Sequence, residues 1–114
     1  MEQVVQNKSF QFAVRIFKLC RYLQNEQKEF VITKQLLRSG TSIGANISES
    51  QQAQSRADFI NKLNIALKEA YETNYWLRLL HAADLLSSAE FQSIHSDCQE
   101  LERLLISIVK AAKQ

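Results

Sequence analysis

The most constraining feature of this sequence is an apolar or small residue at every third or fourth position through two long stretches. The rows are Phe59, Leu63, Ala66, Ala70, Thr73, Leu77 and Leu80 in the first stretch, and Phe91, Ile94, Cys98, Leu101, Leu105, Ile108 and Ala112 in the second. Such spacing keeps one face of an α-helix apolar, whereas a half-buried strand alternates at every second residue. No proline interrupts either stretch. The two stretches therefore predict two long helices with continuous packing faces.

Two earlier segments carry the same helical period. In the first, at about residues 7–24, one row comprises Phe10, Ala13, Phe17 and Cys20, and a second row beside it comprises Phe12, Ile16, Leu19 and Leu23. Two adjacent rows make a stripe that is broader than one helix neighbour needs. In the second, at about residues 30–54, Leu36, Ile43 and Ile47 keep a helical spacing.

Two capping boxes mark the starts of the later helices. In each, a serine is followed three residues later by an acid, at Ser55 with Asp58 and at Ser87 with Glu90. We therefore expect helices at about 56–83 and 88–112. Short links between four helices favour antiparallel neighbours, so residues 1–114 are predicted to form one all-α domain, an antiparallel up-down-up-down four-helix bundle.

The stretch LRSGTSIGANISES, residues 37–50, contains the two glycines of the chain, Gly40 and Gly44. Small residues four apart on a helix let a neighbouring backbone approach closely. A phosphate-binding loop would need a preceding strand and usually a lysine, and no lysine lies between Lys34 and Lys62. We therefore predict a helix-packing or oligomer motif, comprising Arg38, Gly40, Ile43, Gly44, Asn46, Ile47 and Glu49 with Glu69, Glu72, Tyr75 and Trp76.

Several polar and aromatic members of this motif carry specific expectations. Asn46 is expected to be partly buried and to hydrogen-bond to another helix, which would fix the helix register. Arg38 is expected to pair with Glu69 and Glu72, which share one face of the third helix. The aromatic cluster with Tyr75 and Trp76 is expected in core or subunit packing. Stacking on nucleic-acid bases is the alternative for this cluster.

The motif and the later stretch IALKEAYETNYWL, residues 65–77, resemble the bacterial four helix bundle protein family. Members are also called large-subunit ribosomal RNA intervening-sequence proteins, and the accessory protein of diversity-generating retroelements is similar in fold. The resemblance covers nearly the whole chain. It implies a small cytoplasmic bundle that assembles as a homopentamer and has no enzyme activity. Nucleic-acid binding is implied mainly by the retroelement branch.

Charge is unevenly divided between the two halves of the chain. Residues 1–57 carry a net charge of +4 and residues 58–114 carry −2. The first helix has four cations and no acid from Gln3 through Asn25: Lys8, Arg15, Lys18 and Arg21. This face either pairs with acids of the fourth helix, where Glu90, Asp97, Glu100 and Glu102 lie, or binds RNA or a ribonucleoprotein.

Other functional classes find little support in the sequence. No Glu-x-x-His pair for a di-iron site occurs, and His81 with Asp84 supplies too few ligands for a metal. Cys20 and Cys98 are expected to be reduced, buried thiols. No stretch of about 18 uncharged apolar residues predicts a membrane span, and the N-terminus does not resemble a secretory signal.

We therefore expect no catalytic residue, metal, cofactor or small-molecule substrate, and a cytoplasmic location. The leading hypothesis is a non-enzymatic homo-oligomeric scaffold or interaction module. The alternative is an accessory protein that binds structured RNA or an RNA–protein complex through Lys8, Arg15, Lys18 and Arg21.

Overall fold

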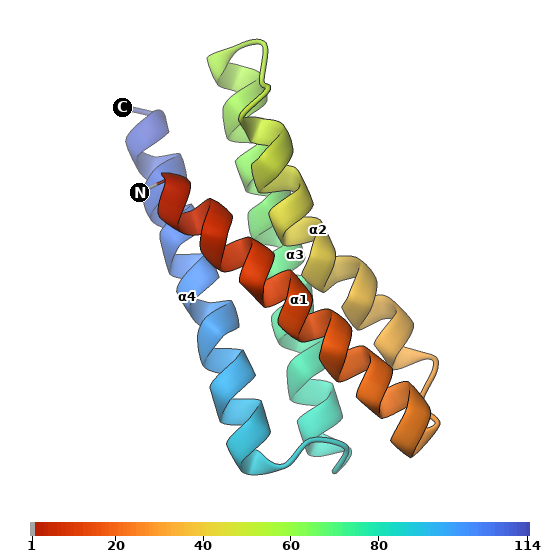
Figure 1. The fold of residues 1–114 in the computed structure, drawn as a ribbon. Helices are drawn as coiled ribbons and strands as arrows, with labels where there is room; N and C mark the ends of the chain where they lie inside the picture. The colour runs from red at the N-terminus through yellow and green to blue at the C-terminus, as the bar shows by residue number, and fades with distance from the viewer. Residues whose placement is uncertain (1) are drawn as a thin grey trace.

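The computed structural model describes residues 2–114, which form four helices joined by short links (Figure 1). The helices are α1 (Glu2–Gln27), α2 (Ile32–Ser50), α3 (Arg56–Ala82) and α4 (Ser88–Ala112). Consecutive helices run antiparallel and pack against each other, so that α2 lies between α1 and α3, and α3 lies between α2 and α4. The predicted all-α, up-down-up-down four-helix bundle is confirmed.

Helix α1 is longer than the predicted 7–24. Its first turns are held by Val5, which is buried in the core, and its last turns extend through the polar residues that were predicted to form a link. Helix α1 ends after Gln27, where Lys28 takes a left-handed backbone conformation with φ of 55°. Polar composition alone therefore did not stop the helix, because the buried Leu23 still anchors its last turns.

Helix α2 starts at Ile32, later than predicted, because Glu29 caps it from the preceding link. The Glu29 carboxylate accepts hydrogen bonds from the backbone N–H groups of Val31, Ile32 and Thr33, at 3.0, 3.0 and 2.7 Å. Burial acts to raise the pKa of this carboxyl, but the hydrogen bonds from the helix N-terminus outweigh it and lower the pKa below 4.5. Glu29 thus satisfies amides that the helix itself leaves unpaired.

Helix α2 also ends earlier than the predicted residue 54. After Ser50 the chain turns, with the amides of Gln51, Gln52 and Ala53 each donating to the carbonyl three residues back. The chain must reverse direction here before α3 begins at Arg56. The helical spacing of the apolar residues was therefore no guide to residues 51–54, which lie past the last buried position of α2.

The serine cap of each predicted capping box is present, but neither acid accepts from the backbone N–H of its serine, since Asp58 accepts from the Gln54 amide and Glu90 from the Ser87 hydroxyl. The Ser55 hydroxyl accepts from the Asp58 amide at 3.0 Å, and the Ser87 hydroxyl accepts from the Glu90 amide at 3.1 Å. These bonds start α3 and α4 at Arg56 and Ser88, within a residue of the expected positions.

The core is a single apolar layer along the bundle axis, and its members are spaced as the sequence predicted. It includes Phe12, Ile16, Cys20 and Leu23 of α1, Leu36, Ile43 and Ile47 of α2, Leu63, Ala66, Ala70, Leu77 and Leu80 of α3, and Ile94, Cys98, Leu101, Leu105 and Ile108 of α4. Phe59 and Phe91 lie at its edge, half-buried.

The four seams between helices are not equal. Helix α1 crosses the bundle obliquely and meets α4 over a much shorter length than it meets α2 (Figure 1). Helices α1 and α3 occupy diagonal corners, with no direct packing between them. One result is that the outer sides of α1 and α3 face opposite directions. None of the helices in residues 2–114 is long and apolar enough to cross a membrane.

Candidate functional site

The glycine motif lies where α2 packs closely against α1. A Cβ atom on Gly40 would lie 2.8 Å from Cγ2 of the buried Ile16, and one on Gly44 would lie 3.3 Å from the backbone oxygen of Ser9. Ile43 and Ile47 point into the core from the adjacent face of α2. The structure thus places the two glycines against a neighbouring helix of the same chain, within hydrogen-bonded helix rather than in a loop.

The seam between α2 and α3 is narrow for a similar reason. The buried hydroxyls of Ser39 and Thr73 meet across it, with Thr73 Oγ1 donating to Ser39 Oγ at 2.9 Å. Two small hydroxyl side chains keep the helices close and satisfy each other inside the core. Neither residue was singled out in the sequence as a partner of the other.

Arg38, Glu69 and Glu72 form the interhelical ion-pair cluster that their spacing predicted. Arg38 Nη1 lies 3.2 Å from Glu69 Oε2, and Arg38 Nη2 binds Glu72 Oε2 directly. The indole N–H of Trp76 also donates to Glu72, at 3.1 Å. These two partners, first the Trp76 hydrogen bond and then Arg38, lower the pKa of the Glu72 carboxyl. The Glu72 carboxylate is therefore held ionised, and Arg38 occupies both carboxylates.

Asn46 differs from the expectation. It is partly buried, but its side-chain amide donates to the Ser42 carbonyl of its own helix at 2.9 Å rather than to another helix. Glu49 instead makes a contact between helices, with Lys62 Nζ of α3 at 3.1 Å from its Oε1. An amide four residues past an available carbonyl can be satisfied locally, which spacing alone did not distinguish from a bond across the seam.

The four cations of α1 fall into two groups. Lys8 pairs with Glu100 at 3.3 Å, and Arg15 pairs with Asp97 at 2.8 Å, so both hold α1 to α4. Lys18 and Arg21 make no ion pair with a carboxylate in residues 2–114, and Arg21 lies over the Phe17 ring at 5.7 Å. The face predicted for RNA is thus half neutralised by the fourth helix.

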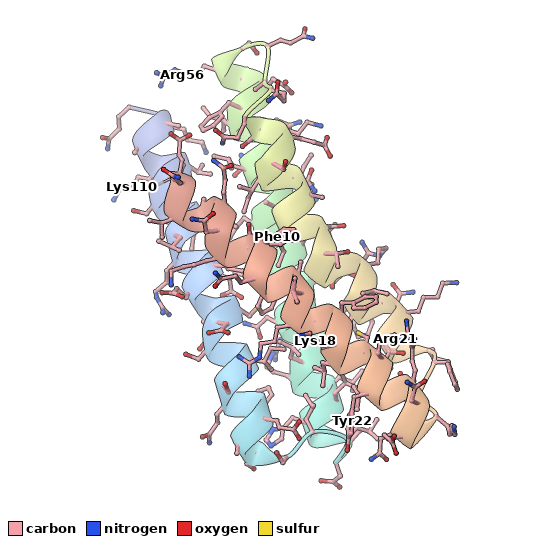
Figure 2. All side chains as sticks on the ribbon, viewed as in Figure 1. Phe10, Lys18, Arg21, Tyr22, Arg56 and Lys110 are labelled. Carbon is pink, nitrogen blue, oxygen red and sulfur yellow. The ribbon has the colours of Figure 1, made fainter. Side chains whose placement is uncertain are left out.

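The outer side of α1 also exposes large apolar side chains. Phe10 is 70% exposed and Phe17 is 46% exposed, and Val14 lies between them along the helix. Figure 2 shows Phe10, Lys18 and Arg21 on the side of α1 that faces away from the rest of the bundle. The broad apolar stripe seen in the sequence therefore has one buried row and one row with no partner in the chain.

A groove of about 430 Å³ runs beside this exposed row, between α1 and α2. It is lined by Gln6, Asn7, Ser9, Phe10 and Ala13 of α1 and by Thr41, Gly44, Ala45 and Ser48 of α2. Because most of these side chains are small, the groove could accept bulky groups from another molecule. We refer to Phe10, Val14, Phe17 and this groove as the α1–α2 face.

Tyr75 and Trp76 lie on the outer side of α3 and at its seam with α2, respectively. Tyr75 is 51% exposed, and its ring meets the Trp76 ring edge-on at 5.1 Å between centroids. Trp76 packs against the core. The aromatic cluster is thus divided, with Trp76 in intramolecular packing and Tyr75 open to solvent beside Tyr71.

A larger hollow, of about 580 Å³, opens at the end of the bundle between the start of α3 and the end of α4. Phe59 and Ile108 form part of its apolar lining. Its one cation, Arg56, donates to the Ala112 carbonyl at the end of α4 and so serves as a helix cap. The polar groups therefore do not converge on a shared point where a ligand could bind.

The remaining reactive side chains have structural partners. Both cysteines are free and buried, and burial raises the pKa of Cys20 to about 12 and that of Cys98 further still. His81 stacks on Phe91, with 4.3 Å between ring centroids, and shares a 3.3 Å hydrogen bond with Ser88. Residues 2–114 contain no group of three side chains that could hold a metal ion.

Comparison with known proteins agrees with the resemblance carried by the motifs. The profile of the 23S rRNA-intervening sequence protein family matches residues 1–107. A crystal structure from Bacteroides thetaiotaomicron VPI-5482, described as a protein with unknown function from the S23 ribosomal protein family, is 62% identical, with a TM-score of 0.95 over 96% of this chain and 97% of that chain. No curated protein matches. The chain therefore belongs to the 23S rRNA-intervening sequence protein family.

Proposed function

We propose that this protein is a non-enzymatic, cytoplasmic scaffold that associates with copies of itself through the α1–α2 face. The observation that carries the proposal is the exposed row of Phe10, Val14 and Phe17 beside a groove of small residues. Single exposed apolar side chains are ordinary, but a contiguous row next to a groove is typical of an interaction site. A chain of 114 residues also gains much from covering such a surface, because its core is small relative to its surface.

The geometry of the carboxylates supports a role without catalysis. Glu69 and Glu72 are the candidates for a catalytic pair of carboxylates, but Arg38 forms an ion pair with both of them. A general acid or base needs a pKa near the working pH, whereas the pKa of Glu72 is lowered. These groups are therefore better suited to holding α2 against α3.

The number of subunits follows from the family resemblance, which favours five. A ring with an odd number of subunits requires a contact between two different surfaces of the chain, since a two-fold contact closes as a dimer. The α1–α2 face would then be one half of each contact. Bulky side chains of a neighbouring copy would enter the groove beside Phe10, and the same contact would repeat around the ring.

The test is the mass of the protein in solution. We expect the wild-type protein to sediment as an oligomer at micromolar concentration and a Phe10→Asp, Phe17→Asp variant to sediment as a folded monomer. Ile106→Asp is the matched control, because Ile106 on α4 is as exposed as Phe17 but lies outside the α1–α2 face. A monomeric wild-type protein, or a double variant that keeps the wild-type mass, would refute the proposal.

RNA binding through α1 is the second candidate function. Lys18 and Arg21 favour it, since both lie on the outer side of α1 without a carboxylate partner among the described residues. The description of the Bacteroides relative as an S23 ribosomal family protein is consistent with a ribonucleoprotein partner. Loss of salt-sensitive RNA retention in a Lys18→Glu, Arg21→Glu variant would support this candidate, and unchanged retention would exclude it.

A further inference from the structure

The outward side of α3 and α4 carries two parallel rows of exposed cations and aromatic or apolar residues. On α3 the row is Lys68, Tyr71, Tyr75 and Arg78, and on α4 it is Arg103, Ile106 and Lys110. Within each row the spacing alternates between three and four residues, so each row lies along one side of its helix. We refer to these seven residues as the α3–α4 face.

The two rows border the same seam. Asn74 of α3 donates to Glu102 of α4 at 2.8 Å, and the Cys98 thiol donates to the Ala70 carbonyl at 3.3 Å. Tyr71 follows Ala70 in the sequence, and Arg103 follows Glu102. Both side chains are exposed, so they emerge on the outer side of this seam. The two rows therefore lie on the same outer side of the bundle, with Lys110 toward the end of the seam where α3 begins.

Four acids of α3 and α4 pair with cations of the other two helices. Glu69 and Glu72 bind Arg38 of α2, while Asp97 and Glu100 bind cations of α1. Glu102 accepts the hydrogen bond from Asn74 within the seam. The four cations of the face, Lys68, Arg78, Arg103 and Lys110, make no ion pair within residues 2–114. In the described part of the chain, the face thus carries four cations without ion-pair partners, with Glu102 as the one carboxylate placed in the seam between its rows, although the second half of the chain is acidic as a whole.

Two tyrosines complete the chemistry of the face. Tyr71 is 48% exposed and Tyr75 is 51% exposed, and the Arg78 guanidinium lies over the Tyr75 ring at 5.7 Å. Exposed aromatic rings flanked by cations are the features with which proteins bind single-stranded nucleic acids, because bases stack on the rings while phosphates meet the cations. An acidic protein partner would use the cations but would not need two open ring faces.

We propose that the α3–α4 face binds single-stranded nucleic acid, with Lys68, Arg103 and Lys110 contacting phosphates and Tyr71 and Tyr75 stacking on bases. This proposal goes beyond self-association and does not require it, because each protomer carries the complete face. Helices α1 and α3 lie on diagonal corners of the bundle, so the α3–α4 face is a different surface from the α1–α2 face. In an oligomer the face would be repeated, which would raise the apparent affinity through multivalency.

The cations are tested with a fluorescein-labelled 20-mer of oligouridine, whose binding is followed by anisotropy between 50 and 300 mM salt. In the Lys68→Gln, Arg103→Gln, Lys110→Gln variant, we expect the slope of log affinity against log salt to become about 2 less negative, since each phosphate contact to a single strand contributes about 0.7. The comparison variant is Lys18→Gln, Arg21→Gln, Lys34→Gln, which removes three exposed cations from α1 and α2, including the two of the second candidate function. If the α3–α4 face is the binding site, the slope changes more in the α3–α4 variant than in this one.

The tyrosines are tested with the same oligonucleotide. Tyr71→Leu with Tyr75→Leu should weaken binding about fivefold or more for each lost stacking contact, with the salt slope unchanged. Tyr22→Leu is the control, because Tyr22 is an equally exposed tyrosine on α1. A 20-base-pair RNA duplex, whose bases cannot stack on the rings, should bind more weakly than oligouridine and should not respond to the tyrosine substitutions. Labelled oligodeoxythymidine shows whether DNA binds as well as RNA.

Several outcomes would overturn the proposal. One is the absence of oligouridine binding by the wild-type protein at 50 mM salt. Another is an equal or greater loss in the α1–α2 comparison variant, which would move the site to α1. Polyglutamate that competes as strongly as oligouridine would indicate an acidic protein partner instead. Circular dichroism shows whether each variant is folded, and sedimentation shows whether it still self-associates. Since nucleic-acid binding does not require self-association, the Phe10→Asp, Phe17→Asp variant should keep the salt slope of a single protomer.

Discussion

Replacing Gly40 with alanine tests whether close approach of α1, and not a need for flexibility, accounts for glycine in the middle of α2. The added Cβ would lie 2.8 Å from Cγ2 and 3.0 Å from Cγ1 of Ile16. Both atoms are attached directly to the Ile16 Cβ, and the side chain is fully buried, so neither can move aside as the end of a flexible side chain can. Helix α1 or the Ile16 rotamer must therefore shift.

Two effects of opposite sign set the change in the free energy of unfolding that Gly40→Ala causes. Alanine is better than glycine in a helix interior by about 1 kcal/mol, whereas overpacking a core costs about 1–3 kcal/mol. We expect the second term to prevail, so that Gly40→Ala lowers the free energy of unfolding by about 1 kcal/mol. At Gly44 the added Cβ would lie 3.3 Å from its nearest neighbour, so Gly44→Ala should change the stability less than Gly40→Ala does.

A double-mutant cycle with Ile16→Ala separates the two terms. Ile16→Ala alone should cost about 2–5 kcal/mol, but it removes the two nearest atoms that the new Cβ would meet and leaves only the Cβ of residue 16, at 3.3 Å. In that background Gly40→Ala should become stabilising by about 1 kcal/mol, which gives a coupling energy of about 2 kcal/mol. Urea unfolding followed by circular dichroism measures all four proteins, at two protein concentrations because association raises apparent stability. A Gly40→Ala substitution that stabilises the wild-type protein, or a cycle without coupling, would refute the steric explanation.

Three further predictions concern other parts of the bundle. Ser55→Ala should lower the free energy of unfolding by about 1 kcal/mol, measured by urea unfolding, because the first amides of α3 lose their acceptor. The pKa of Glu29 is lowered in the folded state, so its contribution is present above pH 4.5 and is lost as the pH falls further. Glu29→Gln should therefore be less stable than wild type at pH 7 but equal to it near pH 2, as measured by unfolding at each pH. Because burial raises the pKa of Cys20 and Cys98, 5,5′-dithiobis(2-nitrobenzoate) should label both thiols only after urea unfolding, and fast labelling of the native protein would contradict their burial.

The fold could be predicted from the sequence because local and long-range signals agree. The three–four rows of α3 and α4 and the serine capping boxes each predict helix over the same residues, and the structure confirms them. The ends of α1 and α2 were less certain. Polar residues at the end of α1 remain helical because Leu23 is buried, and α2 stops at Ser50 because the chain must turn before the next cap. Such ends depend on tertiary packing and on links that apolar spacing does not describe.

The interaction surfaces were less accessible to sequence reasoning. The α1 stripe was visibly too wide for one neighbour, and Phe10 and Phe17 of its outer row proved to be exposed, whereas Cys20 of the same row is buried. By contrast, Arg103 and Lys110 were not connected with Tyr71 and Tyr75, because they lie on different helices, and only the fold shows that both rows border the same seam. Asn46 could have formed a bond to its own helix or to another, and only the structure distinguishes the two. Contacts within one helix follow from spacing, whereas contacts between helices need the register of the bundle.

Charge shows most clearly why the register matters. The excess of cations in the first half of the chain suggested a basic surface on α1, but Lys8, Arg15 and Arg38 each meet carboxylates of the second half across a seam. Every such pair removes a cation from one surface and an acid from another. Four acids of α3 and α4 are drawn into the seams in this way, and the cations on the outer side of those helices are left without partners among the described residues. The basic surfaces of a helical bundle are therefore set by the charges that remain after the seams have formed, and here one of them lies on the half of the sequence whose net charge is negative.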